Sequence, residues 1–168
     1  ATLNKELLDN VVFVVVSNRP RVGMTIVANE LQRLTGAEYF STSEQILKRL
    51  SIAEDLPVEY LREVKISNPE TIRDKLIKLG DQMATEGNPP GVLCARKIKN
   101  EGIKVAVIDG VRRTSELQKV KNELKGYKVV VIGVFGLSEI KDNTEFGLLY
   151  DCDYVILSRW INTVAETE

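Results

Sequence analysis

The chain has 168 residues, of which 43% are hydrophobic, a formal net charge of −1, no histidine, and two cysteines, Cys94 and Cys152. This composition suits one domain with a full core and argues against a general nucleic-acid-binding surface. It also excludes a histidine metal site and a Ser–His dyad. We expect a cytoplasmic protein without a membrane partner, because no apolar run approaches the ~20 residues of a membrane span and no signal-peptide pattern is present.

The first informative stretch covers residues 11–34. Six apolar residues at 11–16 predict a buried strand, a polar loop follows, and the apolar positions of 26–34 recur at helical spacing. Strand, loop and helix in this order are the context of a phosphate-binding P-loop, whose pattern is G-x-x-x-x-G-K-[ST]. The eight corresponding positions are Asn18, Arg19, Pro20, Arg21, Val22, Gly23, Met24 and Thr25.

This loop keeps part of the chemistry of a P-loop. Asn18 replaces the first glycine and tolerates positive φ, and Thr25 can offer its hydroxyl to Mg²⁺. Met24 replaces the lysine, so a charge-assisted hydrogen bond worth ~1.5–3 kcal/mol is lost unless Arg19 or Arg21 replaces it. The stretch suggests a nucleotide-kinase architecture, but the missing lysine argues against nucleotide-kinase activity. A strand–turn–helix that binds no ligand is the alternative.

Helical patterns dominate the middle of the chain. A short strand is expected at 38–41, after a helix that Gly36 ends, and a capping box at 41–44 begins the next helix. Further helices are expected after Pro57, after Pro69 and over 92–100. We therefore predict a helical insertion at about 42–102, between the second and third strands, where a small acceptor could bind.

The second half returns to alternating strands and helices. Strands are expected at 103–109, 129–135 and 153–157, with a helix from Thr114 or Ser115 to Leu124 and a polar connection over 136–146. This alternation predicts an α/β fold with a parallel sheet of about five strands and helices on both faces. Ligands of such sheets bind beyond the carboxyl ends of the strands.

A second constellation lies at 107–113, at the end of an expected strand. Asp109 can hold Mg²⁺ directly or through water. Arg112 and Arg113 each have a guanidinium group whose N–H donors match the geometry of a phosphate. A solvated surface turn is the alternative. Arg73 and Arg96, on helices of the insertion, are candidate ligands or surface arginines.

Glu145 has two interpretations, because it could contact a bound ligand or be exposed to solvent. Met83 and Trp160 are interpreted as packing residues. A homodimer is left open, because the apolar set of Tyr60, Leu61 and Val64 suits a dimer contact as well as a core.

Four segments together resemble the P-loop kinases of the phage-type deoxynucleoside monophosphate kinase group, which is similar to animal-type phosphomevalonate kinase. They are residues 17–25; residues 79–81 with 94–98; residues 109–113 followed by Glu116; and residues 145–148 with 153–156. Each segment is short, and their order and spacing carry the resemblance.

The resemblance implies a single P-loop kinase-like three-layer sandwich over residues 1–168, with ATP and Mg²⁺ as cofactors and a (deoxy)nucleoside monophosphate as acceptor, in a host cytoplasm if the protein is phage-encoded. It implies nucleotide binding by Asn18, Arg19, Arg21, Val22, Gly23, Met24 and Thr25, and metal binding by Thr25 and Asp109. Catalytic roles fall to Arg21, Asp109 and Arg112, and acceptor binding to Ser41, Arg73, Arg96, Arg112, Arg113 and Glu145. Phosphoryl transfer depends on positioning and charge neutralisation, so the lack of histidine is no objection.

Three functions remain open at this point. The chain is an active kinase in which Arg19 or Arg21 replaces the loop lysine, a relative that binds a nucleotide or phosphorylated ligand without turnover, or an interaction scaffold without a ligand. Met24 motivates the second and third of these.

Overall fold

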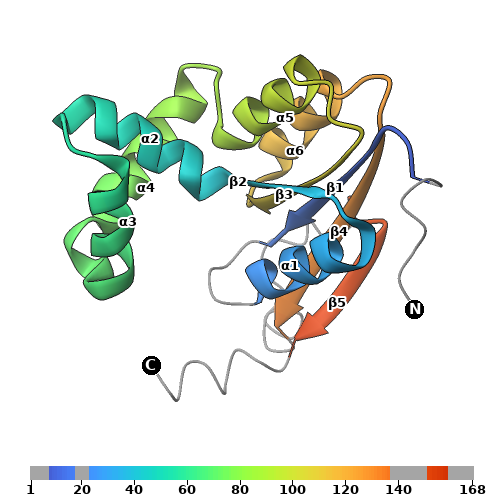
Figure 1. Ribbon diagram of the computed structural model, residues 1–168, viewed down its shortest axis with the longest axis horizontal. Coiled ribbons are helices and arrows are strands. Elements are labelled where there is room, and N and C mark those ends of the chain that lie inside the picture. The colour runs from blue at the N-terminus through green and yellow to red at the C-terminus, as the bar shows by residue number, and fades with distance from the viewer. Residues whose placement is uncertain (1–7, 18–22, 137–150, 159–168) are drawn as a thin grey trace.

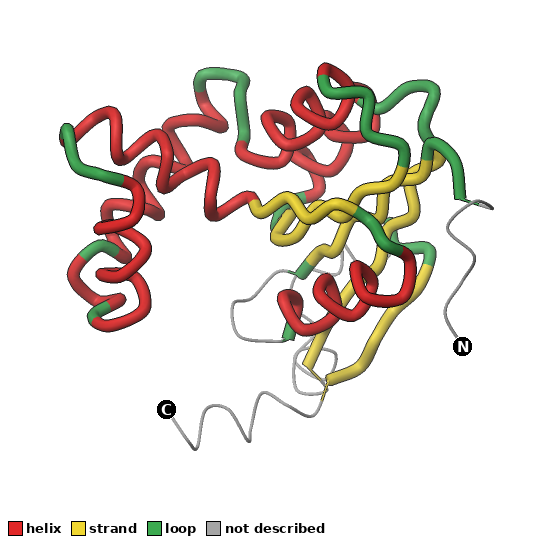
Figure 2. Tube along the Cα trace, in the orientation of Figure 1, coloured by secondary structure: helices red, strands yellow, loops and turns green. Residues whose placement is uncertain are grey.

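The computed structural model describes residues 8–17, 23–136 and 151–158 (Figures 1 and 2). Its strands are β1 (Val11–Val16), β2 (Glu38–Ser41), β3 (Val105–Val111), β4 (Lys128–Gly136) and β5 (Tyr154–Ser158). Its α-helices are α1 (Met24–Thr35), α2 (Thr42–Glu54), α3 (Val58–Ser67), α4 (Arg73–Thr85), α5 (Pro90–Asn100) and α6 (Thr114–Glu123), and a 3₁₀ turn, η2 (Pro69–Thr71), precedes α4.

The five strands form one sheet in the order β2-β3-β1-β4-β5, and all neighbours are parallel. β1 lies at the centre, where its run of valines is covered on both faces, as is typical of parallel sheets. Val12, Val14 and Val16 belong to the core cluster that includes residues of α5 and α6. Phe13 and Val15 belong to the cluster that includes residues of α1. The predicted α/β fold with five parallel strands and helices on both faces is confirmed.

Helices α2 to α5 lie between β2 and β3 in the sequence, which confirms the predicted insertion. Helices α2, α3 and α4 extend away from the sheet (Figures 1 and 2). They have an apolar cluster of their own, which includes Leu47, Leu50, Leu61 and Ile72. Of the apolar set considered for a dimer, Leu61 and Val64 pack into this cluster, and Tyr60 is exposed.

Several element boundaries differ from the sequence prediction. Helix α1 begins at Met24 rather than Ile26, and β3 covers 105–111 rather than 103–109. Strand β3 extends past Asp109 because Gly110 forms a bulge with φ of +108°, after which Val111 pairs with Val16 and is buried.

The start of α6 also differs. Arg113 occupies the N-cap position without a side-chain cap, so neither Thr114 nor Ser115 caps the helix.

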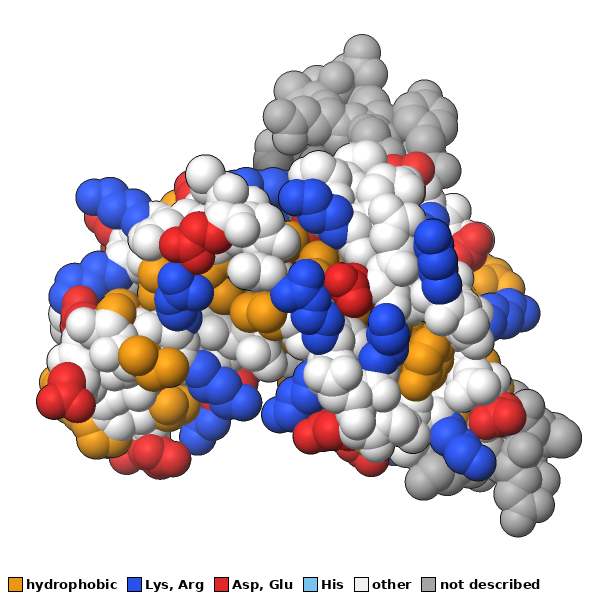
Figure 3. Space-filling model, turned by 90° about the horizontal axis from the view of Figure 1, so that it is seen from above, with side chains coloured by type: hydrophobic (Ala, Val, Ile, Leu, Met, Phe, Trp, Pro, Cys, Tyr) orange, Lys and Arg blue, Asp and Glu red, His pale blue; other side chains and the backbone are white. Residues whose placement is uncertain are grey.

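Some of the apolar side chains that the structure describes are exposed. At the edge strand β5, Tyr154, Val155, Ile156 and Leu157 are all exposed. Seen from above, hydrophobic side chains also gather between charged ones on the part of the molecule that the insertion forms (Figure 3). Basic and acidic side chains alternate across this view. Among the described residues, no helix has both the length and the apolar composition needed to cross a membrane.

Candidate active site

The candidate site lies where β1, β2 and β3 end on one edge of the sheet. Ser41 at the end of β2 pairs with Asp109 of β3, which in turn pairs with Val15 of β1. Because parallel strands place their carboxyl ends together, the polar residues that follow them meet at one edge. The structure therefore brings together three of the predicted site residues: Ser41, Asp109 and, at the start of the helix after β1, Thr25.

Asp109 is the centre of this cluster. It is 5% exposed and is the only acidic or basic side chain that is buried among the described residues. Its Oδ2 atom accepts a 3.0 Å hydrogen bond from the Thr25 hydroxyl and a second hydrogen bond from the Tyr39 hydroxyl. A buried carboxylate needs such donors, because its charge has lost the solvation of water.

Tyr39 is a site residue that the sequence interpretation missed. It lies in β2, two residues before Ser41, so both side chains point to the same side of the strand. Burial raises the pKa of the Tyr39 phenol, and the hydrogen bond and negative charge of Asp109 raise this pKa further. Tyr39 therefore stays protonated at neutral pH and remains a hydrogen-bond donor to Asp109.

Replacing Tyr39 by phenylalanine is expected to destabilise the protein by about 2 kcal/mol, because a hydrogen bond to a charged group is lost. Tyr127→Phe is the matched control, since the Tyr127 hydroxyl donates a 2.8 Å hydrogen bond to the neutral carbonyl of Ile103. This control should cost about 1 kcal/mol. Urea denaturation measures both values. A Tyr39→Phe cost no larger than that of Tyr127→Phe would show that Asp109 does not depend on Tyr39.

The N-terminus of α1 faces the same edge. Gly23 at its N-cap has φ of +95°, which favours glycine, and as a glycine it has no side chain with which to cap the helix. A Cβ placed on Gly23 would have Ser158 Oγ of β5 as its nearest neighbour, at 3.9 Å. The first amides of α1 thus receive no hydrogen bond from a side chain of the N-cap residue itself, and a helix N-terminus of this kind can bind an anion.

Met24 occupies the position of the usual loop lysine. Its side chain is only 7% exposed and belongs to the apolar cluster between α1 and the sheet, together with Val15 and Ala28. A methionine side chain in this cluster cannot contact phosphate, so only the backbone of Met24 remains available for nucleotide binding. Asn18, Arg19, Arg21, Val22 and Glu145 lie outside the described residues, and their predicted roles stay predictions.

The turn after β3 positions Arg112. Arg112 is exposed, yet partial removal from water lowers its guanidinium pKa, while the negative charges of Asp109 and Glu116 raise it. The Glu116 carboxylate accepts hydrogen bonds from the backbone N–H of Gly91 at 2.9 Å and of Arg112 at 3.5 Å. Burial raises the pKa of Glu116, and these two hydrogen bonds oppose that change.

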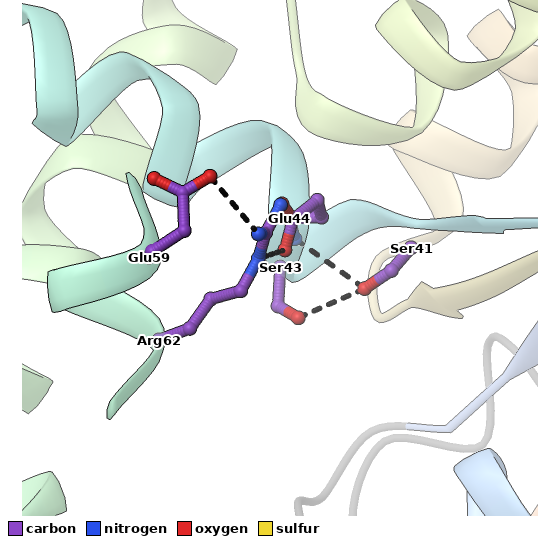
Figure 4. A network of polar contacts seen from close by, with 5 residues as sticks. All are labelled: Ser41, Ser43, Glu44, Glu59 and Arg62. Carbon is purple, nitrogen blue, oxygen red and sulfur yellow. Dashed lines mark hydrogen bonds and ion pairs between the residues drawn. The ribbon is translucent and has the colours of Figure 1, made fainter. Parts of the chain in front are cut away.

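Ser41 connects the sheet to the insertion (Figure 4). Its Oγ accepts a 3.3 Å hydrogen bond from the Glu44 backbone and lies 2.9 Å from Ser43 Oγ, so Ser41 caps α2 as predicted. The Glu44 carboxylate forms an ion pair with Arg62 of α3, which also contacts Glu59. This network fixes one face of α3 relative to the carboxyl edge of β2.

Three other predicted arginines that the structure describes, Arg73, Arg96 and Arg113, pair with acids other than Asp109. Arg96 forms an ion pair with Glu123, the last residue of α6, whereas the site lies at the other end of that helix. Arg113 binds Asp81 of α4, and Arg73 is 3.7 Å from Glu70. All three arginines are exposed and paired with an acid, which suits a solvated surface rather than an acceptor pocket.

A hollow of about 270 Å³ lies beside the edge strand β2. Tyr39 and Ser41 line it together with Lys48 and Lys97, but Asp109 and Thr25 do not. The hollow and the cluster around Asp109 therefore adjoin one another and share Tyr39 and Ser41.

Comparison with known proteins gives similarity at the level of structure alone. No family model matches the sequence, and no curated protein matches it. A candidate kinase from Chloroflexus aurantiacus has 10% sequence identity and a TM-score of 0.49, with 95% of this chain and 94% of that chain covered. Shikimate kinase from Acinetobacter baumannii, solved with shikimate, has 11% identity and a TM-score of 0.46, with 98% and 94% covered. Likeness at these values concerns the path of the backbone and leaves activity to be argued from the site.

Proposed function

We propose that the protein transfers a phosphoryl group from ATP to a small phosphorylated acceptor, with a (deoxy)nucleoside monophosphate as the acceptor class. The contact between Asp109 and Thr25 carries this proposal. A buried carboxylate at the end of β3 and a hydroxyl in the first turn of α1 lie 3.0 Å apart, beside a helix N-terminus whose N-cap residue is a glycine. Oxygen ligands and an anion-binding helix end are thus adjacent, as Mg²⁺ with a polyphosphate requires.

The residues at this edge fit Mg²⁺ rather than a softer metal. No group of three or more acidic, cysteine or histidine side chains gathers in the described part of the chain. Mg²⁺ does not need one, because it is usually held by one or two carboxylates together with water and substrate phosphates. Asp109 and Thr25 would hold it, and the bound ion would neutralise charge on the phosphates.

The other residues of the site have supporting roles in this proposal. Tyr39 orients the Asp109 carboxylate through its hydrogen bond. The amides at the start of α1 would bind phosphate oxygens. Arg112, after the β3 bulge, presents a guanidinium that suits a phosphoryl group.

A second candidate function is nucleotide binding without turnover. The burial of Met24 favours it, because the position of the usual loop lysine is filled by an apolar side chain. A missing transition-state contact of this kind can cost roughly 10²–10³ in rate. The two functions share one binding site and differ in whether a phosphoryl group moves.

The test is calorimetric titration of the protein with ATP in the presence and absence of Mg²⁺. We expect binding that depends on Mg²⁺ and weakens at least about tenfold in Asp109→Asn, because the variant lacks the charged metal ligand. Glu101→Gln, an exposed acid at the end of α5, controls for the change in net charge. Absence of ATP binding, or equal affinity of Asp109→Asn and the parent protein, would contradict the proposal.

A phosphotransfer assay separates the two candidates. The protein is incubated with ATP, Mg²⁺ and each member of a panel of ribo- and deoxyribonucleoside monophosphates, and ADP formation is followed. ADP that depends on one monophosphate supports a kinase. Binding of ATP without ADP formation from any acceptor supports the non-catalytic alternative.

A further inference from the structure

Lys65 of α3 is a basic residue that none of the recognised motifs contains. It lies one helical turn after Arg62, on the face of α3 that the Arg62–Glu44 ion pair fixes against the start of α2. That start is capped by Ser41, the register partner of Asp109. A continuous series of contacts thus connects the sheet edge to the turn of α3 that carries Lys65.

A second chain of contacts positions Arg112 at the same edge. The Thr42 hydroxyl of α2 donates a 3.1 Å hydrogen bond to the carbonyl of Gly110, two residues before Arg112. The start of α2 is therefore joined both to α3 and to the turn after β3. As a result, Lys65 and Arg112 are held near one another and near Asp109.

The electrostatics agree with this placement. Lys65 is half-buried, and removal from water lowers its pKa, as does the like charge of Arg112, whereas Glu44 and Asp109 raise it. No ion pair joins either cation to an acid anywhere in the described ranges 8–17, 23–136 and 151–158.

The three acids whose charges act on these cations already have hydrogen-bond donors or an ion-pair partner. Glu44 pairs with Arg62, Asp109 accepts from Thr25 and Tyr39, and Glu116 accepts from two backbone amides. The positive charge of Lys65 and Arg112 is therefore only partly neutralised. Two like charges held together at the edge of a site are stabilised when an anion binds between them.

We infer that Lys65 and Arg112 form a phosphate-binding pair, in which Lys65 supplies from the insertion the positive charge that Met24 does not supply from the loop. The inference rests on the proposed function for the identity of the ligand. Its chemistry, two cations for one doubly charged phosphate group, suits either the terminal phosphate of the donor or the phosphate of a monophosphate acceptor.

The first experiment uses tripolyphosphate, which has no base or sugar, at constant ionic strength. We expect Lys65→Met to weaken its binding about tenfold or more, and Lys65→Arg to stay within about threefold of the parent, because it keeps the charge. Lys78→Met is the matched control, since Lys78 is an exposed lysine of α4 in the same insertion. Equal tripolyphosphate affinity of Lys65→Met and the parent, or no binding by the parent, would overturn the inference.

A second readout separates a binding role from a structural one. Without phosphate, Lys65→Met should melt at the same temperature as the parent or higher, because it removes a desolvated charge that Arg112 repels. A lower melting temperature would show that Lys65 supports the fold and would count against the pair.

ATP and AMP then distinguish the two sources of phosphate. A larger loss of ATP affinity in Lys65→Met places the donor phosphate on the pair, and a larger loss of AMP affinity places the acceptor there. The proposed function is tested separately by Asp109→Asn with ATP and Mg²⁺. Tripolyphosphate binding that depends on Lys65 would stand even if ATP binding proved independent of Asp109.

Discussion

Gly110→Ala is expected to lower the free energy of unfolding by about 3 kcal/mol, which is a large fraction of the stability of one domain. Two causes add up. Gly110 has φ of +108°, where any side chain is strained, and a Cβ would lie 2.4 Å from Thr42 Oγ1. Relief of this overlap requires the Thr42 hydroxyl to move away and to give up its hydrogen bond to the Gly110 carbonyl, and urea denaturation measures the cost.

Gly126→Ala is the matched control for the strain alone. Gly126 has φ of +98°, and nothing lies within 4 Å of the Cβ that would be added. This variant should lose only about 1–2 kcal/mol. The double variant Gly110→Ala/Thr42→Ala should be less destabilised than the sum of its single changes, because the overlap disappears. Equal costs for Gly110→Ala and Gly126→Ala would mean that α2 does not constrain the bulge.

Leu61→Ala is expected to cost about 3 kcal/mol and to act on the insertion rather than on the sheet. Leu61 is 1% exposed in the apolar cluster of α2, α3 and α4, which is separate from the two clusters that flank the sheet. The cavity left by the smaller side chain should therefore loosen α3 first. Hydrogen exchange should show faster exchange of α3 amides with little change in β1 and β3.

Ile66→Ala serves as the control on the same helix. Ile66 is 84% exposed, so its truncation should change stability by no more than about 0.5 kcal/mol. If Leu61→Ala accelerates exchange equally in α3 and β1, the insertion and the sheet unfold as one unit. Because α3 carries Lys65, a loosened insertion should also bind tripolyphosphate more weakly than the parent protein.

The sequence predicts the fold well because its strands are distinct. The apolar runs at 11–16, 103–109 and 129–135 identify three buried strands, and the glycine and proline residues between helices mark the insertion. The end of β3 is harder to predict. The sequence pattern predicts that the strand ends at Asp109. In the structure, the bulge at Gly110 allows Val111 to pair with β1 again.

The candidate site is predicted only in part. Thr25 and Asp109 follow from the P-loop spacing and from an acid at a strand end, and the structure places them in contact. Tyr39 and Lys65 have no motif, because they reach the site through the register of β2 and the orientation of α3. Such tertiary placement depends on contacts between residues far apart in the sequence.

The side chains of Met24 and Arg96 are placed by tertiary contacts rather than by the sequence pattern. The sequence leaves Arg96 open as a ligand or a surface arginine, and in the structure it pairs with Glu123, whereas Met24 belongs to the cluster beneath α1. A motif position fixes where the backbone lies more reliably than where the side chain points. A methionine at a lysine position has no charge to hold it toward an anion, so it packs with its apolar neighbours.

The strand order has a consequence for synthesis of the chain. β1, with the sequence VVFVVV, is made before either of its neighbours, since β3 begins only at Val105 and β4 at Lys128. At roughly 5–20 residues per second, a ribosome needs several seconds to supply them. During that interval, a short, uncharged and strongly β-forming segment has no native strand to pair with. The nascent chain is therefore exposed to aggregation until β3 emerges. Whether the yield of folded protein depends on chaperones is a natural property to examine.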